Sequence, residues 1–279
     1  MSVLGASTAV SARLTHYPVL GGQALRYALA AAVFAVIVRR RSPPGGRPRL
    51  RPSGRDWLLL TLLSVTGLIL FNIFVLAALR HTDAATLGSV VACSPLVLAI
   101  AGPLVTGSGP GPKRGPALGA AGLVVAGSAV VQGFGHGSAI GVVFAVLVLV
   151  NESLFSLLAV PLLPRFGELR VSAYVTAIAV PVLLIAAFAT DGTAMLRVPT
   201  LGEAAALLYL SLLLTVGAFL LWYRALGGLG PQRAGLLIGT VPVSACAASA
   251  ILGVGTPGVA QLAGVAVVVL GIVTGLART

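Results

Sequence analysis

Acidic residues are scarce in this chain, and charges of either sign are few. Of 279 residues only six are Asp or Glu, and charged residues together make up 9%, whereas a soluble domain carries about 25%. Hydrophobic residues make up 58%, and the mean hydropathy is +1.06. A soluble core cannot bury that much apolar surface. The composition therefore excludes an ordinary soluble domain and indicates an all-α membrane protein, since apolar runs of the length needed to span a bilayer recur along the chain.

Cysteine and histidine are also rare. Cys93 and Cys246 both fall inside apolar runs, which is typical of buried small residues and not of a disulfide framework. An intramembrane enzyme such as a protease would need paired Asp residues, an HExxH motif or Ser with His at membrane depth. His16, His81 and His136 lie at or near the ends of expected helices, so this alternative receives little support. No GxxxxGK[ST] motif occurs, which argues against ATP-driven transport by this chain. We expect no cofactor and no metal.

Basic residues are the main charge that is present, and they give a net charge of +12. They lie between the apolar runs, mainly at 39–55, 106–115, 164–170 and 224–233, and form no cluster typical of a nucleic-acid-binding domain. Lys and Arg are retained on the cytoplasmic side during membrane insertion. With both termini cytoplasmic, ten spans would place all four links on that side. Nine spans would preserve the alternation but separate the termini.

Ten apolar segments are expected to be transmembrane helices. The first precedes Pro18 and is short, so we expect a truncated first helix. The others are expected at about 20–38, 57–79, 84–105, 116–131, 138–163, 171–190, 204–226, 234–254 and 259–276.

An internal repeat organises these segments. The stretch Ala78–Pro95 recurs 147 residues later as Ala225–Pro242, and each piece joins two apolar runs through a short polar link. The identities are Ala78/Ala225, Leu79/Leu226, Gly88/Gly235 and Pro95/Pro242. Five spans per half, an odd number, would give the halves opposite orientations in the membrane. We therefore predict two inverted five-helix repeats, at residues 1–132 and 138–277.

Three stretches carry a resemblance to a known family: ALRYALAAA at 24–32, ALRHTDAATLGSVVACSPLV at 78–97 and AFLLWYRALGGLGPQRAGLLIGTVPV at 218–243. Their order and spacing resemble the EamA-type transporters of the drug/metabolite transporter superfamily. The resemblance implies a ten-helix carrier of the bacterial inner membrane, multi-pass, with a cytoplasmic C-terminus. Members often end spans four and nine with a Leu-Gly-Glu-like turn, which this chain lacks.

Glu152 is the most informative polar residue, because it lies near the middle of the sixth span. An ionised group at mid-membrane costs roughly 2.5–3.5 kcal/mol on insertion scales unless it faces a cavity or a partner. Ser156 follows one turn later on the same face, and Asn151 is adjacent. One interpretation is a proton- or cation-coupling carboxylate. The other is an acid that is paired with a buried Arg, or capped by hydroxyls, for packing alone.

Other polar residues are weaker candidates for a substrate or proton pathway. Arg26, with Tyr27 beside it, could bind a substrate carboxylate or neutralise Glu152, or could extend to the outer headgroups. Asn72 could hydrogen-bond to a neighbouring helix. These interpretations stay open at this point.

The eighth span carries a stripe of Ser211, Thr215 and Trp222. Such stripes more often pack helix on helix than line a path. Trp222 and Tyr223 are expected to be interfacial anchors near the cytoplasmic end.

Two further patterns concern helix shape and packing. Pro95 and Pro242 are expected to kink spans four and nine. Gly115-xxx-Gly119 and Gly271-xxx-Gly275 are expected to allow close helix contacts.

These observations favour a secondary transporter, not an enzyme. We predict that it exports small metabolites, amino-acid-like or drug-like, by alternating access, with protons as the candidate coupling ion. The expected partners are the solute, the lipid bilayer and protons, and a homodimer stays open. The alternative is a degenerate, non-transporting paralogue or scaffold.

Overall fold

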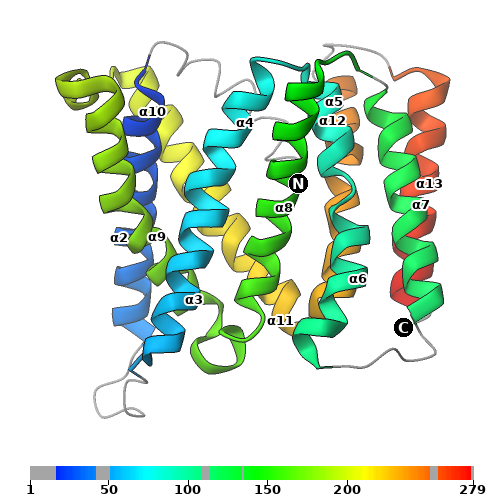
Figure 1. Cartoon of the computed structure of the whole chain (residues 1–279), viewed down its shortest axis with the longest axis horizontal. Coiled ribbons are helices and arrows are strands. Elements are labelled where there is room, and N and C mark those ends of the chain that lie inside the picture. Colours follow the sequence, from blue (N-terminus) through cyan, green and yellow to red (C-terminus); the bar gives the residue numbers. More distant parts are fainter. Residues whose placement is uncertain (1–16, 42–50, 108–113, 134, 252–256, 278–279) are drawn as a thin grey trace.

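The computed structural model describes residues 17–41, 51–107, 114–133, 135–251 and 257–277, and the regular elements in these ranges are helices. Figure 1 shows them standing side by side between an upper and a lower edge, where the links lie. Eight helical segments within these ranges are long and apolar enough to cross a membrane. The chain is thus an all-helical, multi-pass membrane protein. The expected first span lies outside the described residues.

The helices of the first half are α2 (Val19–Arg41), α3 (Gly54–Ser64), η2 (Val65–Leu70), α4 (Phe71–Leu79), α5 (Ala84–Val91), α6 (Ser94–Thr106) and α7 (Arg114–Gln132). Those of the second half are α8 (Ala139–Ala159), α9 (Leu163–Asp191), η3 (Gly192–Leu196), α10 (Leu201–Tyr209), η4 (Leu210–Gly217), α11 (Ala218–Leu236), η5 (Leu237–Gly239), α12 (Thr240–Ile251) and α13 (Val259–Ala277). η2 and η4 are π-helical, and η3 and η5 are 3₁₀ turns.

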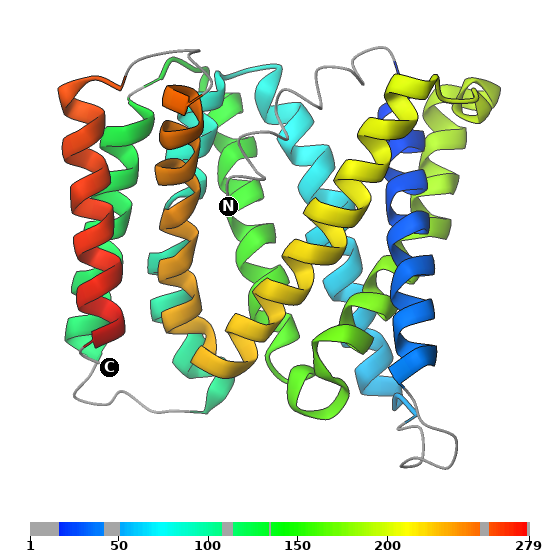
Figure 2. The same ribbon diagram turned by 180° about the vertical axis from the view of Figure 1, so that it is seen from behind.

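One of the eight membrane-crossing segments, Leu201–Ile251, is 51 residues long and contains two crossings. Figure 2 shows α10 and α11 descending to the lower edge and α12 rising from it. The turn lies at Gly230, whose positive φ of 77° suits glycine. Pro231 follows at the start of the next helix, where its missing N–H has no intrahelical role. The described residues thus account for expected spans two to ten, and the total of ten stays a prediction.

The same local features recur in the two halves, 147 residues apart. Ser53 and Asp56 form a capping box at the start of α3, and Thr200 and Glu203 form one at the start of α10. The π-helical segments η2 and η4 follow, and their last residues, Leu70 and Gly217, are again 147 residues apart. α3 begins near the lower edge and α10 near the upper edge (Figure 1). These features support the inverted repeat, which remains a prediction.

The two polar links of the repeat, here called hinges, join span three to span four and span eight to span nine. In both, the helix is interrupted at matching residues. Asp83, with ψ of 165°, caps the N-terminus of α5, and Gly230, with ψ of 166°, takes the equivalent place. A second break follows in each half, at Ala92–Cys93 and at the 3₁₀ turn η5. Spans four and nine are therefore each broken into pieces.

Pro95 and Pro242 lie just after these second breaks. Each occupies the first turn of a new helix, α6 or α12. The first N–H groups of a helix lack intrahelical partners, so a proline removes little there. The change of direction therefore precedes each proline and does not occur at it.

The first hinge is held by the turn that precedes α8. Asp83 accepts hydrogen bonds from the backbone N–H groups of His136 (2.7 Å) and Thr86 (2.8 Å), and these bonds hold its pKa below the usual value. The N–H and hydroxyl of Ser138 both donate to the His81 carbonyl. The upper end of α8 is therefore fixed to the start of α5.

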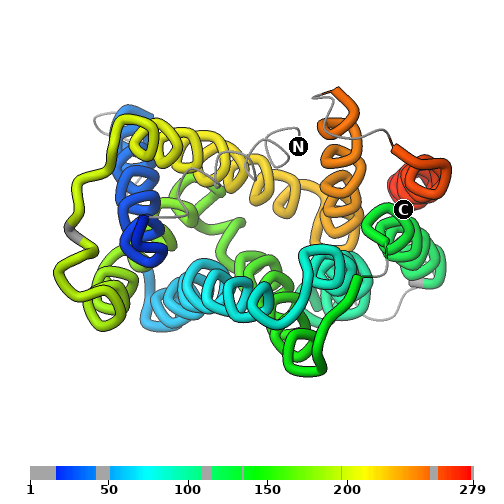
Figure 3. The backbone as a smooth tube through the Cα atoms, turned by 90° about the horizontal axis from the view of Figure 1, so that it is seen from above, coloured from blue at the N-terminus to red at the C-terminus, as the bar shows by residue number. Residues whose placement is uncertain are grey.

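Two helix pairs form the ends of the bundle. α2 packs along α9, and α7 packs along α13 (Figure 3). In the second pair a Cβ on Gly127 would lie 2.7 Å from the Gly264 carbonyl oxygen, and one on Gly264 would lie 2.8 Å from that of Gly127. The two backbones touch at these glycines.

The expected glycine motifs differ in their surroundings. A Cβ on Gly271 would lie 2.9 Å from the Ala120 carbonyl oxygen, and one on Gly275 would lie 2.8 Å from the Ala120 Cβ. A Cβ on Gly115 or Gly119 would meet nothing within 4 Å. The close contact predicted for Gly271-xxx-Gly275 is confirmed, and the one predicted for Gly115-xxx-Gly119 is wrong.

We predict that Gly127→Ala destabilises the protein, whereas Gly119→Ala on the same helix does not. The added methyl at residue 127 would overlap the backbone of α13, and overpacking costs about 1–3 kcal/mol. At residue 119 the methyl enters open space. The measurement is the thermal unfolding midpoint of each purified variant in detergent. Equal midpoints for the two variants would contradict the contact.

Candidate functional site

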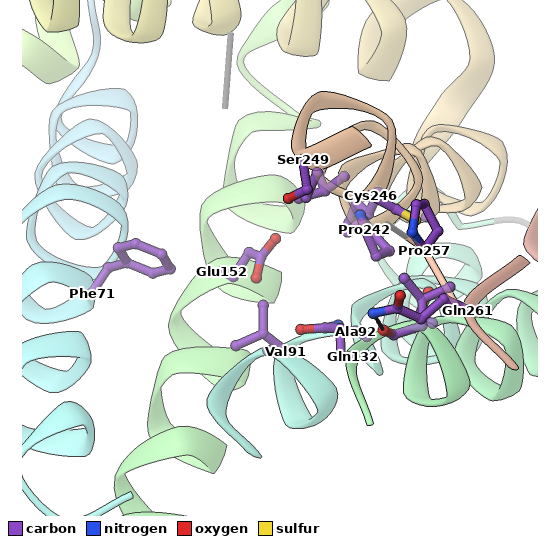
Figure 4. Close-up of a pocket in the computed structure, with 17 residues that line it drawn as sticks. Phe71, Val91, Ala92, Gln132, Glu152, Pro242, Cys246, Ser249, Pro257 and Gln261 are labelled. Atoms are coloured by element: carbon purple, nitrogen blue, oxygen red, sulfur yellow. Dashed lines mark hydrogen bonds between the residues drawn. The ribbon is translucent and has the colours of Figure 1, made fainter. Parts of the chain in front are cut away.

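A cavity of about 730 Å³ lies among α5, α7, α8, α12 and the start of α13. Its size is typical of small-molecule sites, which range over about 300–1,000 Å³. Most of its lining is apolar, including Phe71, Val91 and Pro242 (Figure 4). The polar lining residues are Ser128, Gln132, Glu152, Cys246, Ser249 and Gln261.

Glu152 lies deep in this cavity, on the side of α8 that faces α12 (Figure 4). It is 13 residues beyond Ala139, where α8 begins at the upper edge. A rise of about 1.5 Å per residue puts it roughly 20 Å from that end, near mid-membrane. Its Oε2 atom is buried and has no hydrogen-bond partner among the described residues. Such an atom is costly to desolvate without a ligand or a proton.

The Ser94 hydroxyl is the hydrogen-bonding neighbour of the Glu152 carboxyl. Ser94 comes from the break in span four, where it begins α6. Its Oγ also donates to the Val91 carbonyl at 2.7 Å.

The residues expected to accompany Glu152 do not line the cavity. The Ser156 hydroxyl donates to the backbone carbonyl of Glu152 (3.3 Å) and not to its carboxyl. Asn151 is buried and donates to the Leu147 carbonyl at 2.7 Å. Its Oδ1 has no partner within the part of the chain that the structure describes.

Arg26 belongs to a second polar cluster, which lies between α2 and η4. Its Nε donates to Thr215 Oγ1 at 2.8 Å, and its guanidinium also reaches Gln23. The same guanidinium lies over the Tyr27 ring, 5.1 Å from its centre. Arg26 therefore pairs with span eight and not with Glu152 in this conformation.

Other expected site residues extend this cluster or pack near it. Asn72 donates to the Tyr27 hydroxyl (3.3 Å) and to the Leu68 carbonyl (2.6 Å). Ser211 is buried and donates to the Leu207 carbonyl of its own helix. The cluster thus joins α2 to spans three and eight by side-chain contacts.

The aromatic pair on α11 is less interfacial than expected. Tyr223 is fully buried and packs against Phe155 and Phe219, so its expected role as an anchor is wrong. Trp222 is partly buried against the same core.

Several cavity residues carry no strong signal in the sequence. Gln132 ends α7 and Gln261 lies in the first turn of α13, where polar residues usually act as caps. The Gln132 amide covers Gly88: a Cβ at that glycine would overlap its Oε1 atom. The identity of Gly88 and Gly235 in the repeat is the only hint of a close approach there.

The chain is similar in sequence to known proteins that are named as transporters. A family model described as the EamA-like transporter family matches residues 1–132 and 139–275. The chain is 26% identical over 260 residues to the uncharacterized transporter YetK of Bacillus subtilis, covering 90% of this chain and 77% of that protein. It is also 26% identical over 198 residues to an uncharacterized transporter of Archaeoglobus fulgidus, covering 69% and 67%.

A solved structure described only as the crystal structure of a protein has the same fold. It superposes with a TM-score of 0.77 at 20% identity, covering 99% of this chain and 95% of that chain.

We predict that Thr215→Val lowers stability without altering the cavity. The change leaves the Arg26 Nε without its acceptor, and a lost bond to a charged donor costs about 1–3 kcal/mol. Thr274→Val is the control, because the Thr274 hydroxyl bonds only to carbonyls of its own helix. The thermal unfolding midpoint should fall for Thr215→Val and hold for the control. Equal losses would show that the Arg26 contact adds nothing.

Proposed function

The chain belongs to the EamA-like transporter family, and from this premise we propose that it is a secondary transporter that exports small metabolites across the bacterial inner membrane by alternating access. Membership in this family, and relatives named as transporters, point to a transporter and not to an enzyme. The observation that carries the proposal is the cavity with Glu152 at mid-membrane depth.

Glu152 is the proposed site of proton coupling. Its buried Oε2 atom, which has no hydrogen-bond partner among the described residues, suits a neutral carboxyl better than a carboxylate, because burying an uncompensated charge costs more than burying a neutral group. Ionisation becomes favourable when a cation or water enters the cavity. A carboxyl that changes its proton with the contents of the cavity couples solute movement to protons.

The cavity faces one side of the membrane. It extends from Glu152 toward the upper edge, where Gln132, Pro257 and Gln261 lie at helix ends. Arg39, Arg40 and Arg41 lie in the last turn of α2, which ends at the lower edge (Figure 1), and by the positive-inside rule this edge is cytoplasmic. The conformation is therefore assigned as outward-facing.

Below the cavity, α6 packs against the start of the helix that follows Gly230. A Cβ on Gly102 would lie 2.9 Å from the Pro231 ring, and one on Gly235 would lie 3.1 Å from the Leu98 Cβ. The Gln232 side chain donates to the Ala99 carbonyl at 3.2 Å. This contact is the proposed closed gate on the cytoplasmic side.

The 147-residue offset between the repeats indicates which residues would form the equivalent gate on the outer side. Shifting by 147 residues, Leu98 corresponds to Ala245 and Gly235 to Gly88, while Gly102 corresponds to Ser249. All three counterparts line the cavity, Gly88 from α5 and Ala245 and Ser249 from α12. In the inward-facing state we expect Ala245 of α12 to pack on Gly88 of α5, as Leu98 packs on Gly235 here. The Gln132 amide, which now covers Gly88, has to move for this closure.

We predict that Glu152→Gln abolishes pH-driven flux while the protein still folds. The amide has nearly the same shape but cannot release a proton in the physiological range. The measurement is solute flux into proteoliposomes with and without a pH gradient, over a panel of amino acids and drug-like compounds. Gel filtration and the unfolding midpoint serve as the folding control. A normal pH dependence of flux in this variant would rule out the coupling role.

We also predict that two cysteine pairs report opposite states. After Cys93 and Cys246 are replaced by Ser, Leu98→Cys with Gly235→Cys should cross-link readily. The two Cβ positions lie 3.1 Å apart and need to separate only slightly to reach the range of about 3.5–4.5 Å found in disulfides. Gly88→Cys with Ala245→Cys should cross-link only during turnover. Each disulfide should stop flux, and reduction should restore it. Failure of the second pair to cross-link under any transport condition would contradict the gate.

A further inference from the structure

The charge distribution around the cavity is one-sided. Of the described residues that line it, Glu152 is acidic and none is Lys, Arg or His. Arg26, which the sequence offers as a partner for Glu152, is engaged by Thr215 and Gln23 in the other cluster. The remaining polar lining consists of hydroxyls, one thiol and two amides. Nothing among these residues would compensate a buried negative charge on a solute.

The elements packed against α8 supply no further charge to the cavity. They are α3, η2, α4, α5, α6 and α11. Their titratable residues are Arg55, Asp56, Tyr223, Arg224 and Arg233, and none of these lines the cavity. Cys246 is the other titratable residue on the cavity wall, across from Glu152 on α12. The electrostatics of the site thus depend on Glu152.

We propose that the cavity selects organic cations with an apolar body, and that such a cation binds Glu152 in exchange for its proton. The apolar walls take the body, and the free carboxyl oxygen takes the cationic head. In the exchange the carboxyl O–H bond breaks, the proton leaves to water in the cavity, and the carboxylate pairs with the cation. Net charge in the site is unchanged. This inference rests on the proposed function and adds the class of solute.

Anions are disfavoured by the same geometry. A solute carboxylate would have to leave water and lie near an acidic group without a compensating cation. Neutral amphipathic solutes would fit the walls, but they would leave the Glu152 oxygen without an ionic partner. The cavity therefore distinguishes solutes by charge more than by shape.

The test uses the full-length protein in nanodiscs and three probes with a benzyl group: benzyltrimethylammonium, neutral phenylmethanol and phenylmethanesulfonate. Isothermal titration calorimetry should detect binding of the cation only. Because one proton is released per cation bound, its Kd should fall about tenfold per pH unit wherever Glu152 is protonated, and level off above that range. Cation affinity therefore rises with pH.

Three variants identify the residue responsible. Glu152→Gln should weaken cation binding at least roughly tenfold and remove its pH dependence. Glu152→Asp should retain both, which separates the charge from a folding defect. Glu168→Gln, which removes an acid on α9 away from the cavity, should bind like the parent protein. Tighter binding of the sulfonate or of phenylmethanol than of the ammonium probe would overturn the proposal.

The outcomes also separate this inference from the proposed function. If the panel contains a transported neutral or anionic solute while benzyltrimethylammonium does not bind, the solute class is wrong and the transporter assignment stands. If the cation binds with the expected pH dependence and no solute moves, the transport assignment fails and the binding site stands.

Discussion

In hydrocarbon no water is present to satisfy a broken backbone hydrogen bond, so a transmembrane helix can be interrupted only where the chain itself replaces the lost partners. The breaks within spans four and nine follow that constraint. At the first, the Ala92 N–H bonds to the Gly88 carbonyl and the Cys93 N–H to the Val90 carbonyl; at the second, the Thr240 N–H bonds to the carbonyls of η5. The links between spans lie at the edges of the bundle, where Asp83 caps α5 and Gly230 permits a positive φ. These features occur at matching places in the two halves.

The breaks also determine where a cavity can form. Span four changes direction at Ala92–Cys93, and span nine does so at η5. The pieces toward the upper edge, α5 of span four and α12 of span nine, both line the cavity. The lower pieces stay in contact through Gly102 and Gly235. The interrupted helices therefore take part both in the cavity on the upper side and in the close contact on the lower side, which is the arrangement that the proposed alternating access requires.

Much of the fold could be predicted from the sequence, because the bilayer requires long apolar runs that are easy to recognise. Glu152 could be predicted for the same reason: a charge inside such a run has few structural explanations. The neighbours of Glu152 could not be predicted, because they depend on which helices meet in space. Arg26 is as conspicuous as Glu152 in the sequence, yet it faces Thr215. Gln132 and Gln261 resemble ordinary helix caps until the ends of α7 and α13 are placed around one cavity.

Symmetry and asymmetry are divided between two kinds of residue. The groups that shape and close the path recur at an offset of 147 residues: the capping boxes, the hinge residues, and Gly88 with Gly235. Glu152 has no described counterpart, since residue 5 lies outside the described ranges. Packing in the two halves must be similar if the two facing states are to have similar free energies. A single titratable group is enough to bind a proton in both states. In the proposed mechanism the repeat thus serves the conformational change, while one carboxyl carries the proton.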